Sequence, residues 1–253
     1  MVNAWGVKNG LSLGQIKVSD KSNEITAILQ LLELLEIKGA IVTIDAMGCQ
    51  KNIAATIIEN EADYVLALKG NQTSLHKEVQ TYFEAHQLKL QENTSDRLFL
   101  ETVEKEHGRI ETRSYFQIAL ENEVLQWVPS LKDWKGIQSL VVVKSQREVG
   151  EKSSSESRYY ISSLSLDVRV AAEAVRGHWG VENSLHWVLD VVFGDDKSRI
   201  RKDYAPQNFN LIKKLTINAL KQESTRKSLS LANKRALAAM DNRYLEKLIA
   251  GLS

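Results

Sequence analysis

The stretch Ala40–Gly70, AIVTIDAMGCQKNIAATIIENEADYVLALKG, places a helical pattern between two short apolar runs. The runs "AIVTID" and "DYVLALKG" have the length and continuity of strands that are buried on both faces of a sheet. The intervening "QKNIAATIIENEA" has the apolar spacing of a helix. A strand, a helix and a second strand in this order are typical of parallel strands in one sheet. The stretch therefore predicts a layered α/β fold.

The residues on either side of this stretch continue the same pattern. Upstream, "VNAWGV" and "LSLGQIKVS" alternate apolar and polar residues around Asn9-Gly10, which is a strong hairpin signal. The next segment, "SNEITAILQLLELLEIKG", has a Ser/Asn cap, helical spacing and a terminating Gly39. Downstream, "TSLHKEVQTYFEAHQ" predicts another helix. Residues 1–87 are therefore predicted to form the first part of an α/β core.

The pattern changes from about Leu88 onward. Three β-rich segments, "RLFLETVEKEHGRIETRSYFQIAL", "IQSLVVVKSQRE" and "SRYYISSLS", predict an insertion over residues 88–163. Helical spacing resumes in "LDVRVAAEAVRGHWGVENSLHWVLDVVF", so residues 164–205 are predicted to complete the core with a long helix. Residues 206–253 are predicted to form a basic helical extension.

Composition limits the class of protein. The chain has 253 residues, 43% of them hydrophobic and 26% charged, which is ordinary for a globular protein. Its single cysteine, Cys49, excludes an internal disulfide and a cysteine-based zinc site, and fits a reducing cytoplasm. No apolar run approaches the ~18 residues of a membrane span, and the N-terminus lacks a signal-peptide layout. We therefore expect a cytoplasmic protein without a membrane partner.

Charge is distributed unevenly along the chain. From Lys197 to the end, 13 Lys/Arg stand against 4 Asp/Glu, a net of +9, whereas residues 1–196 carry 20 − 28 = −8. Such an asymmetry suggests a basic tail that meets phosphates. A set of solvated helix faces is the alternative.

Asp45 directly follows the first buried strand of the opening stretch. Open α/β sheets bind ligands at the carboxyl ends of their strands, so this carboxylate is a candidate site residue. The following Ala46-Met47-Gly48 provides a turn of small residues before the next helix. The alternative is an Asp that only caps that helix.

The predicted long helix carries polar residues at intervals of four. His178, Glu182 and His186 share one stripe, while Trp179 and Trp187 lie on a neighbouring stripe and are expected to pack the helix against the core. Three readings remain open for the polar stripe: a zinc site, a catalytic carboxylate with its neighbours, or core and capping histidines. The usual zinc-protease spacing places a Glu directly beside the first His, which this stretch does not.

Three further clusters contain basic or polar side chains. If "HGRIETR" is a strand, Arg109, Glu111 and Arg113 point to one face, which forms either an ion-paired sheet face or a surface that reaches a phosphate backbone. The segment 69–72 ends the second buried strand at the same sheet edge as Asp45, and a solvated loop is the alternative there. The run "DDKSRIRK" is either a phosphate-contacting segment or simply solvated charge.

Taken together, several motifs resemble one family. The stretches "SDKSNEITAI", "IVTIDAMGCQ", "YVLALKGNQ", "HGRIETR", "RGHWGVENSLHWVLDVVF" and "DDKSRIRK" resemble, in order and over nearly the whole chain, the ISAs-type (H-repeat-associated) insertion-sequence transposases. These are DDE transposases, and the resemblance implies a ribonuclease-H-like core. It also implies phosphodiester hydrolysis and strand transfer at transposon ends by two divalent metal ions, Mg²⁺ or Mn²⁺.

The resemblance also assigns roles to residues. Asp45 matches the second Asp of the catalytic triad and Glu182 matches its Glu, so both are expected to ligate metal. DNA ends and target DNA are the implied partners, with a possible homodimer in a synaptic complex. The expected DNA contacts are Lys69, Arg109, Arg113, Arg176, His178, Lys197, Arg199, Arg201 and Lys202. Two positions depart from the wider superfamily, since His178 stands where Arg is expected and Leu189 where Lys is expected.

The first catalytic Asp of the family has no match. In the family it lies in an Asp-Gly-Lys stretch upstream of the "VNAW" hairpin, and this chain starts at Met1, directly before that hairpin. We therefore expect an N-terminally truncated transposase that lacks the first core strand and the helical DNA-binding N-terminal region, and that is catalytically incompetent. The alternatives are a DNA-binding or assembly remnant without catalysis, and a zinc hydrolase that uses His178, Glu182 and His186.

Overall fold

The computed structural model describes residues 1–18, 23–106 and 108–251. Its contacts divide the chain into two compact units. One unit combines Met1–Ser22 with Trp179–Ser253, and the other is Asn23–His178. We call them the terminal unit and the central unit and describe each by itself. The boundaries predicted at residues 87, 163 and 205 stay predictions.

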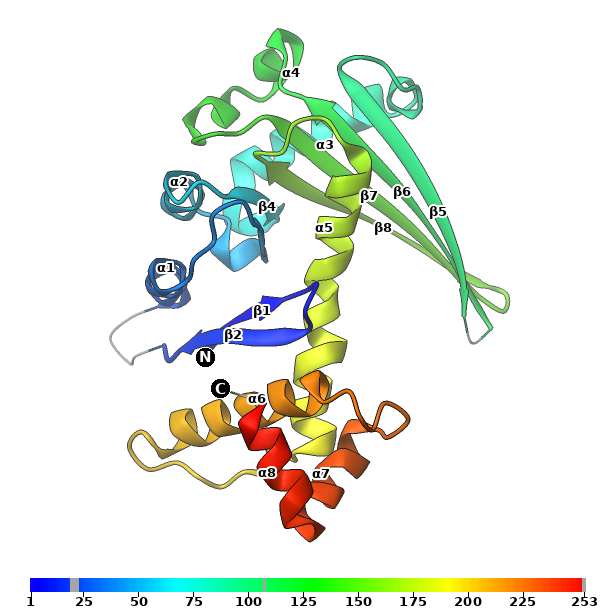
Figure 1. The fold of residues 1–253 in the computed structure, drawn as a ribbon. Helices are drawn as coiled ribbons and strands as arrows, with labels where there is room; N and C mark the ends of the chain where they lie inside the picture. The colour runs from blue at the N-terminus through cyan, green and yellow to red at the C-terminus, as the bar shows by residue number, and fades with distance from the viewer. Residues whose placement is uncertain (19–22, 107, 252–253) are drawn as a thin grey trace. The chain divides into compact units, whose positions relative to one another are not determined.

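The central unit is built on a six-stranded mixed sheet with the order β3-β4-β8-β7-β6-β5 (Figure 1). Its strands are β3 Ile41–Ile44, β4 Asp63–Leu68, β5 Arg97–Glu106, β6 Arg109–Ala119, β7 Ser139–Val149 and β8 Lys152–Ser162. β3 and β4 pair in parallel, as the opening stretch predicts, and all other pairs are antiparallel. Because β4 pairs with β8, the β-rich segment continues the same sheet.

Helices and short turns connect these strands. The helices are α1 Glu24–Leu34, α2 Lys51–Glu59, α3 Thr73–His86, α4 Asn122–Trp127 and α5 Val168–Val181. Short 3-10 turns lie at Ala46–Gly48, Gly70–Gln72, Lys89–Gln91 and Pro129–Asp133. The predicted cap of α1 is confirmed, because the Asn23 side chain accepts a hydrogen bond from the Thr26 amide at 3.0 Å. α1 ends at Leu34, five residues before the predicted Gly39.

Helices pack on both faces of the sheet. α5 buries Val168, Ala171, Ala172 and Val175 against one face, whose core residues are Val65, Tyr115, Val141, Val143 and Tyr160. α3 packs on the other face, where the ring centroid of Phe83 lies 5.2 Å from that of Phe116 and 6.1 Å from that of Tyr159. Because side chains alternate along a strand, these contacts define an α5 face and an α3 face for β5–β8.

A buried polar network fixes the chain just before α5. Gln117 on β6 is fully buried, and its Nε2 donates hydrogen bonds to the Ser139 hydroxyl at 3.0 Å and to the Ser165 carbonyl at 2.9 Å. The Oε1 atom of Gln117 accepts a hydrogen bond from the Asp167 amide at 2.8 Å. Since Asp167 directly precedes α5, this one side chain ties the start of the helix to the sheet interior.

Neighbouring serines extend the same network toward β4. The Ser162 hydroxyl donates to the Tyr64 carbonyl at 3.0 Å and accepts from the Leu164 amide at 3.0 Å. The Ser163 hydroxyl accepts a hydrogen bond from the Tyr64 amide at 2.8 Å. The turn that follows β8 is thereby bonded to both β4 and β7, where the Ser139 hydroxyl donates to the Leu164 carbonyl.

The terminal unit contains a hairpin and a helical region. The predicted hairpin is confirmed as β1 Val2–Gly6 paired with β2 Leu11–Ile16, and Gly10 closes its turn with φ of 63°. The helices are α6 Ala205–Gln222, α7 Leu231–Met240 and α8 Asn242–Ala250, preceded by π-helical segments Glu182–His186 and Val188–Val192 and a 3-10 turn at Asp195–Lys197. These three helices cover most of residues 206–253, and the assignment of this segment as a C-terminal extension stays a prediction.

α6 joins the hairpin through polar contacts. Asn218 accepts a hydrogen bond from the Ser12 amide at 2.9 Å and donates to the Ser12 carbonyl at 2.8 Å. Lys214 is almost fully buried and bonds to the side-chain oxygens of Asn3 and Gln15, and its burial lowers its pKa to about 8. The apolar side of this region is a cluster of Leu185, Val188, Leu189 and Ile217.

We expect the variant Gln117→Leu to destabilise the protein by about 1–3 kcal/mol, because it leaves the Asp167 amide and its neighbours without a buried partner. Urea unfolding monitored by circular dichroism measures the change. The matched control is Gln146→Leu, since Gln146 lies on the exposed part of β7 and should change stability by less than about 0.5 kcal/mol. Equal stability of both variants would contradict the structural role of the network.

Candidate functional site

Asp45 lies at the carboxyl end of β3 and is exposed. Its Oδ1 atom accepts a hydrogen bond from the Met47 amide at 3.1 Å, so it caps the 3-10 turn Ala46–Gly48. The capping role considered for this residue is therefore confirmed. It uses one carboxylate oxygen and leaves the second oxygen without a hydrogen bond among the described residues, so capping does not exclude a ligand role.

Gly48 sets the shape of the turn that follows Asp45. An added Cβ at this position would lie 2.3 Å from the Cγ2 atom of Ile44, which is too close for any side chain. Cys49, the next residue, is fully buried, and its burial raises the pKa of the thiol to about 12. The thiol is therefore an inert core group rather than a nucleophile.

The loop after β4 lies against the Asp45 turn. The Asn71 side chain donates a hydrogen bond to the Ala46 carbonyl, and the Gln72 side chain donates to the Cys49 carbonyl at 2.9 Å. The prediction that residues 69–72 share a sheet edge with Asp45 is confirmed. Lys69, at the start of this loop, is exposed.

Glu182 begins the π-helical segment Glu182–His186. Its side chain is 59% exposed, and its Oε2 atom lies 3.1 Å from Nδ1 of His186. The sequence pattern assumed a regular α-helix here, and this assumption is wrong from Glu182 onward. Single π-helical turns occur frequently at functional sites, because the extra residue per turn redirects side chains.

His178 takes a different partner from His186. Its Nδ1 atom lies 3.3 Å from the Thr43 hydroxyl on β3, two residues before Asp45. This contact links α5 to the strand that ends at Asp45. Among the described residues, no group of three or more His, Cys, Asp or Glu side chains is arranged to hold a metal ion. The stripe of His178, Glu182 and His186 therefore does not assemble the proposed zinc site in the described structure.

Trp179 and Trp187 lie on the neighbouring stripe. Trp179 is 42% exposed and Trp187 is 56% exposed, so the expectation that both pack the helix against the core is wrong. The smaller side chains of α5 and the cluster around Leu185 make those core contacts instead.

Asp190 lies four residues after His186 and continues the polar spacing of His178, Glu182 and His186. Desolvation and the nearby carboxylates of Asp196 and Asp195 raise the pKa of Asp190.

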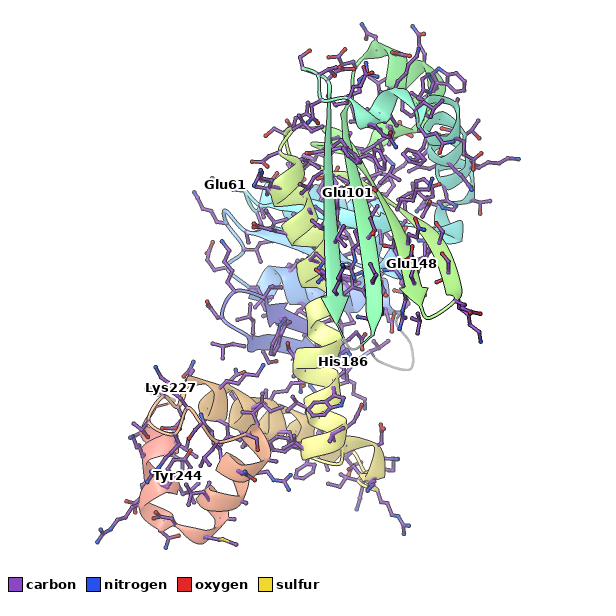
Figure 2. The ribbon with its side chains drawn as sticks, turned by 90° about the vertical axis from the view of Figure 1, so that its right-hand side faces the viewer. Glu61, Glu101, Glu148, His186, Lys227 and Tyr244 are labelled. Atoms are coloured by element: carbon purple, nitrogen blue, oxygen red, sulfur yellow. The ribbon has the colours of Figure 1, made fainter. Side chains whose placement is uncertain are left out.

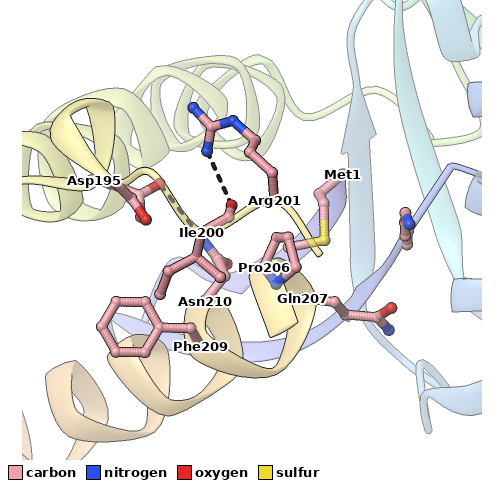
Figure 3. Close-up of a pocket in the computed structure, with 10 residues that line it drawn as sticks. Met1, Asp195, Ile200, Arg201, Pro206, Gln207, Phe209 and Asn210 are labelled. Carbon is pink, nitrogen blue, oxygen red and sulfur yellow. Dashed lines mark hydrogen bonds between the residues drawn. The ribbon is translucent and has the colours of Figure 1, made fainter. Parts of the chain in front are cut away.

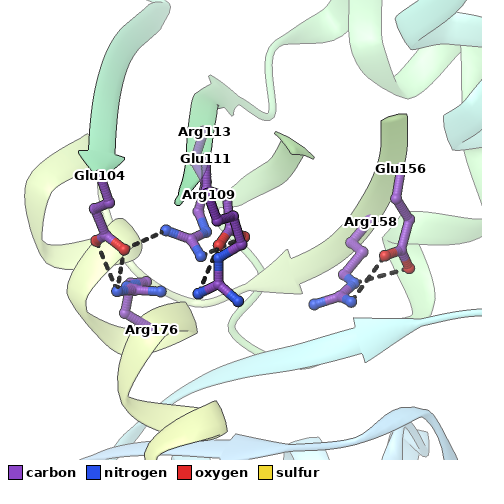
Figure 4. Close-up of polar contacts among 7 residues, drawn as sticks. All are labelled: Glu104, Arg109, Glu111, Arg113, Glu156, Arg158 and Arg176. Atoms are coloured by element: carbon purple, nitrogen blue, oxygen red, sulfur yellow. Dashed lines mark hydrogen bonds and ion pairs between the residues drawn. The ribbon is translucent and has the colours of Figure 1, made fainter. Parts of the chain in front are cut away.

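The predicted basic side chains of the central unit form ion pairs (Figure 4). Arg113 is bonded to Glu104 at 2.9 Å and also pairs with Glu111, while Arg176 on α5 bonds to Glu104 at 2.7 Å. Arg109 lies 3.6 Å from Glu111. The hydrogen bond from Arg113 and the charges of both arginines lower the pKa of Glu104. Of the two readings for "HGRIETR", the ion-paired sheet face is the one that the structure contains, while His107 lies outside the described residues.

The basic segment of the terminal unit is exposed and irregular. Lys197, Arg199, Arg201 and Lys202 all lie at the surface. Asp195 anchors the start of the segment to α6 through a 2.6 Å ion pair with the buried Lys213. Arg201 and Asp195 also line a shallow surface pocket of about 200 Å³ next to α6 (Figure 3).

The sequence did not identify several of these features. Lys213 and Lys214 look like solvated charges, and only the tertiary structure shows that both are buried against polar partners. The ion-paired partners Glu104 and Arg176 are 72 residues apart, so no local pattern connects them. The Glu223 side chain is likewise buried, and hydrogen bonds from Thr225, Lys234 and Arg226 lower the pKa of its carboxyl to about 2. Its carboxylate also accepts a hydrogen bond at 3.2 Å from the hydroxyl of Tyr244, which is labelled in Figure 2.

Comparison with known proteins identifies the family. A family model described as "Transposase DDE domain" matches residues 1–219. The chain belongs to the DDE transposase family. It is 41% identical over 256 residues to "Putative transposase YncI" of Escherichia coli O157:H7, covering 100% of this chain and 64% of that protein. It is also 40% identical over 255 residues to "H repeat-associated putative transposase YhhI" of Escherichia coli K12, covering 99% of this chain and 65% of that protein.

The chain spans slightly less than two thirds of the length of these transposase relatives. The predicted resemblance to H-repeat-associated transposases is confirmed. Within the described residues, no helix is both long enough and apolar enough to cross a membrane.

We expect the variant Gly48→Ala to destabilise this transposase chain by about 1–3 kcal/mol, because the new Cβ overlaps the Ile44 side chain. Urea unfolding measures the effect. Gly70→Ala is the matched control: it changes a glycine in the adjacent 3-10 turn, where an added Cβ meets nothing within 4 Å. If Gly48→Ala were as stable as the control, the tight turn after Asp45 would not need glycine.

Proposed function

We propose that this chain contributes to the catalytic part of a DNA transposase, which cleaves DNA at transposon ends and transfers the strands. The observation that carries the proposal is the family match across residues 1–219, which includes Asp45 and Glu182. We propose these two carboxylates as metal ligands and Asp45 as the second acid of the family triad. The parallel pair β3–β4, with Asp45 at its carboxyl end, supports a ribonuclease-H-like core.

The side chains of Asp45 and Glu182 offer the oxygen ligands that a hard divalent cation prefers. Both are exposed, and carboxylate oxygen is the ligand that Mg²⁺ and Mn²⁺ prefer. When bound, a metal pair activates the attacking oxygen and stabilises the leaving oxygen in phosphodiester chemistry. His186 contacts one carboxylate oxygen of Glu182 and orients that side chain, while the Met47 amide orients Asp45.

A pair of metal ions needs more ligands than two carboxylates. We therefore propose that a third acid, outside these 253 residues, completes the metal site, and that these residues alone do not catalyse DNA cleavage. DNA binding without cleavage is the activity proposed for them alone. The proposed division into core, insertion, completing helix and basic extension follows the same family assignment.

DNA is the proposed partner, in the cytoplasm and at the bacterial nucleoid. The residues of the terminal unit contain 16 Lys/Arg and 9 Asp/Glu, a net of +7, and Lys197, Arg199, Arg201 and Lys202 lie together at the surface. A homodimer in a synaptic complex remains part of the proposal. Arg113 and Arg176 are the weakest of the proposed DNA contacts, because both are already ion-paired with Glu104 and Arg113 also pairs with Glu111.

A nicking assay on supercoiled plasmid tests the proposal. With Mg²⁺ or Mn²⁺, we expect no cleavage by the 253 residues alone, but binding to duplex DNA that weakens as salt rises. When the chain is joined to the part of the YncI relative that lies outside the 64% covered by the match, we expect the joined protein to cleave the plasmid. The variant Asp45→Asn or Glu182→Gln should then lower the rate by about 10³-fold or more, since a lost metal ligand removes several kcal/mol of transition-state stabilisation.

The control for this assay is Glu92→Gln, an exposed acid of the central unit that should leave the rate unchanged. Cleavage by the 253 residues alone that disappears with Asp45→Asn would overturn the incompetence and retain the site. Full activity of both carboxylate variants in the joined protein would overturn the site itself.

A further inference from the structure

The distal halves of β5–β8 carry opposite charge patterns on their two faces. Strand register and side-chain alternation place these halves beyond the hydrophobic core, with the α5 face on one side and the α3 face on the other (Figure 1). The basic residues of the α5 face, including α5 itself, are Lys69, Arg109, Arg113, Arg147, Lys152, Arg158, Arg169 and Arg176. The described acidic side chains there are Glu104, Glu111, Glu156 and Glu173, so basic side chains outnumber acidic ones by eight to four. The α3 face carries Glu101, Lys105, Lys144 and Glu148, which cancel.

The basic side chains gather on the α5 face although the central unit as a whole is acidic. Residues 23–178 contain 17 Lys/Arg and 23 Asp/Glu, a net of −6. An acidic unit that gathers its basic side chains on one face of an exposed sheet creates a local positive potential, which attracts an anionic ligand.

The basic residues of the α5 face fall into two groups. Arg113 and Arg176 are held by Glu104, and Arg158 is bonded to Glu156 at 2.8–2.9 Å (Figure 4). Arg147 and Lys152 are exposed, and their side chains form no hydrogen bond or ion pair with any described residue. A cation that already has a carboxylate partner gains less from a phosphate than one that has none.

Arg147 and Lys152 lie close together on the β7–β8 hairpin. In the register, Arg147 pairs with Ser154 and Val149 pairs with Lys152, so Arg147 and Lys152 are diagonal neighbours. Diagonal positions on one face are about 7–8 Å apart at Cα, which lets two long side chains reach one backbone together. Ser145 and Ser154, on the same face, add hydroxyl donors that suit phosphate oxygens.

We propose that the α5 face of β5–β8 binds the phosphate backbone of duplex DNA, and that Arg147 and Lys152 make its principal contacts. The inference rests on the proposed function, because it adds a second DNA surface to a transposase. It differs from the sequence-based assignment in one respect: on this face the binding energy comes from Arg147 and Lys152 rather than from the ion-paired Arg113 and Arg176.

The test compares two double variants in the full chain. Arg147→Ala/Lys152→Ala removes two charges from the α5 face, and Lys105→Ala/Lys144→Ala removes two charges from the α3 face of the same sheet, one on β5 and one on β7. The two double variants have the same net charge, so a difference between their DNA affinities shows which face of the sheet binds DNA. Circular dichroism and thermal unfolding confirm that each variant is folded, and the single variants Arg147→Gln and Lys152→Gln serve if the double variant is not.

Fluorescence anisotropy with a 30-base-pair duplex of random sequence is the readout. We expect the α5-face variant to bind about tenfold more weakly at ~0.1 M salt, and to lower the slope of log K against log salt by about 2. The α3-face variant should bind within twofold of the unchanged chain. Equal losses in both variants would overturn the inference, because the effect would then follow net charge alone.

The remaining outcomes separate this inference from the proposed function. If the unchanged chain binds DNA and only replacing Lys197, Arg199, Arg201 and Lys202 by Ala weakens binding, the α5 face is not a DNA surface and the proposed function stands. If the unchanged chain binds no duplex at any salt concentration, DNA binding as proposed for these residues fails together with the inference.

Discussion

The buried side chain of Gln117 holds the architecture of the central unit together. It bonds at once to β7, to the turn after β8 and to the amide that opens α5. A buried amide satisfied on both its oxygen and its nitrogen specifies one arrangement, because every alternative leaves a polar group without a partner. The apolar contacts of Val168, Ala171 and Val175 then position α5 along the sheet.

The anchored helix α5 also contacts the strand that precedes Asp45. α5 contacts β3 through His178 and Thr43. Asp45 directly follows β3, and its carboxylate is oriented by the turn that Gly48 permits. Glu182 follows α5 directly in the chain, at the first residue of a π-helical segment. Both acids are exposed, and each uses one oxygen for a local hydrogen bond. We propose both acids as metal ligands on the basis of the family assignment.

Local patterns in the sequence predicted the order of strands and helices in residues 1–87, but not α4 within the β-rich segment. The hairpin at Asn9-Gly10, the cap at Asn23 and the parallel pair around Ala40–Gly70 all follow from turn chemistry and apolar periodicity. The pattern could not predict the π-helical geometry after Val181, because periodicity at four-residue intervals fits an α-helix equally well. The pattern also did not predict that Trp179 and Trp187 are exposed, because the same spacing of tryptophans occurs on helix faces that pack against a core. Arg147 and Lys152 appear as ordinary charges until the strand register places them on one face.

We propose that Asp45 and Glu182 both ligate a divalent cation in this transposase chain. Electron paramagnetic resonance of a Mn²⁺ titration measures this binding without requiring catalysis. We expect Mn²⁺ to bind to the protein in which this chain is joined to the unmatched part of the YncI relative. Asp45→Asn and Glu182→Gln should each weaken this binding at least tenfold, whereas Glu92→Gln should leave it unchanged. Unchanged Mn²⁺ affinity in both carboxylate variants would contradict the proposal.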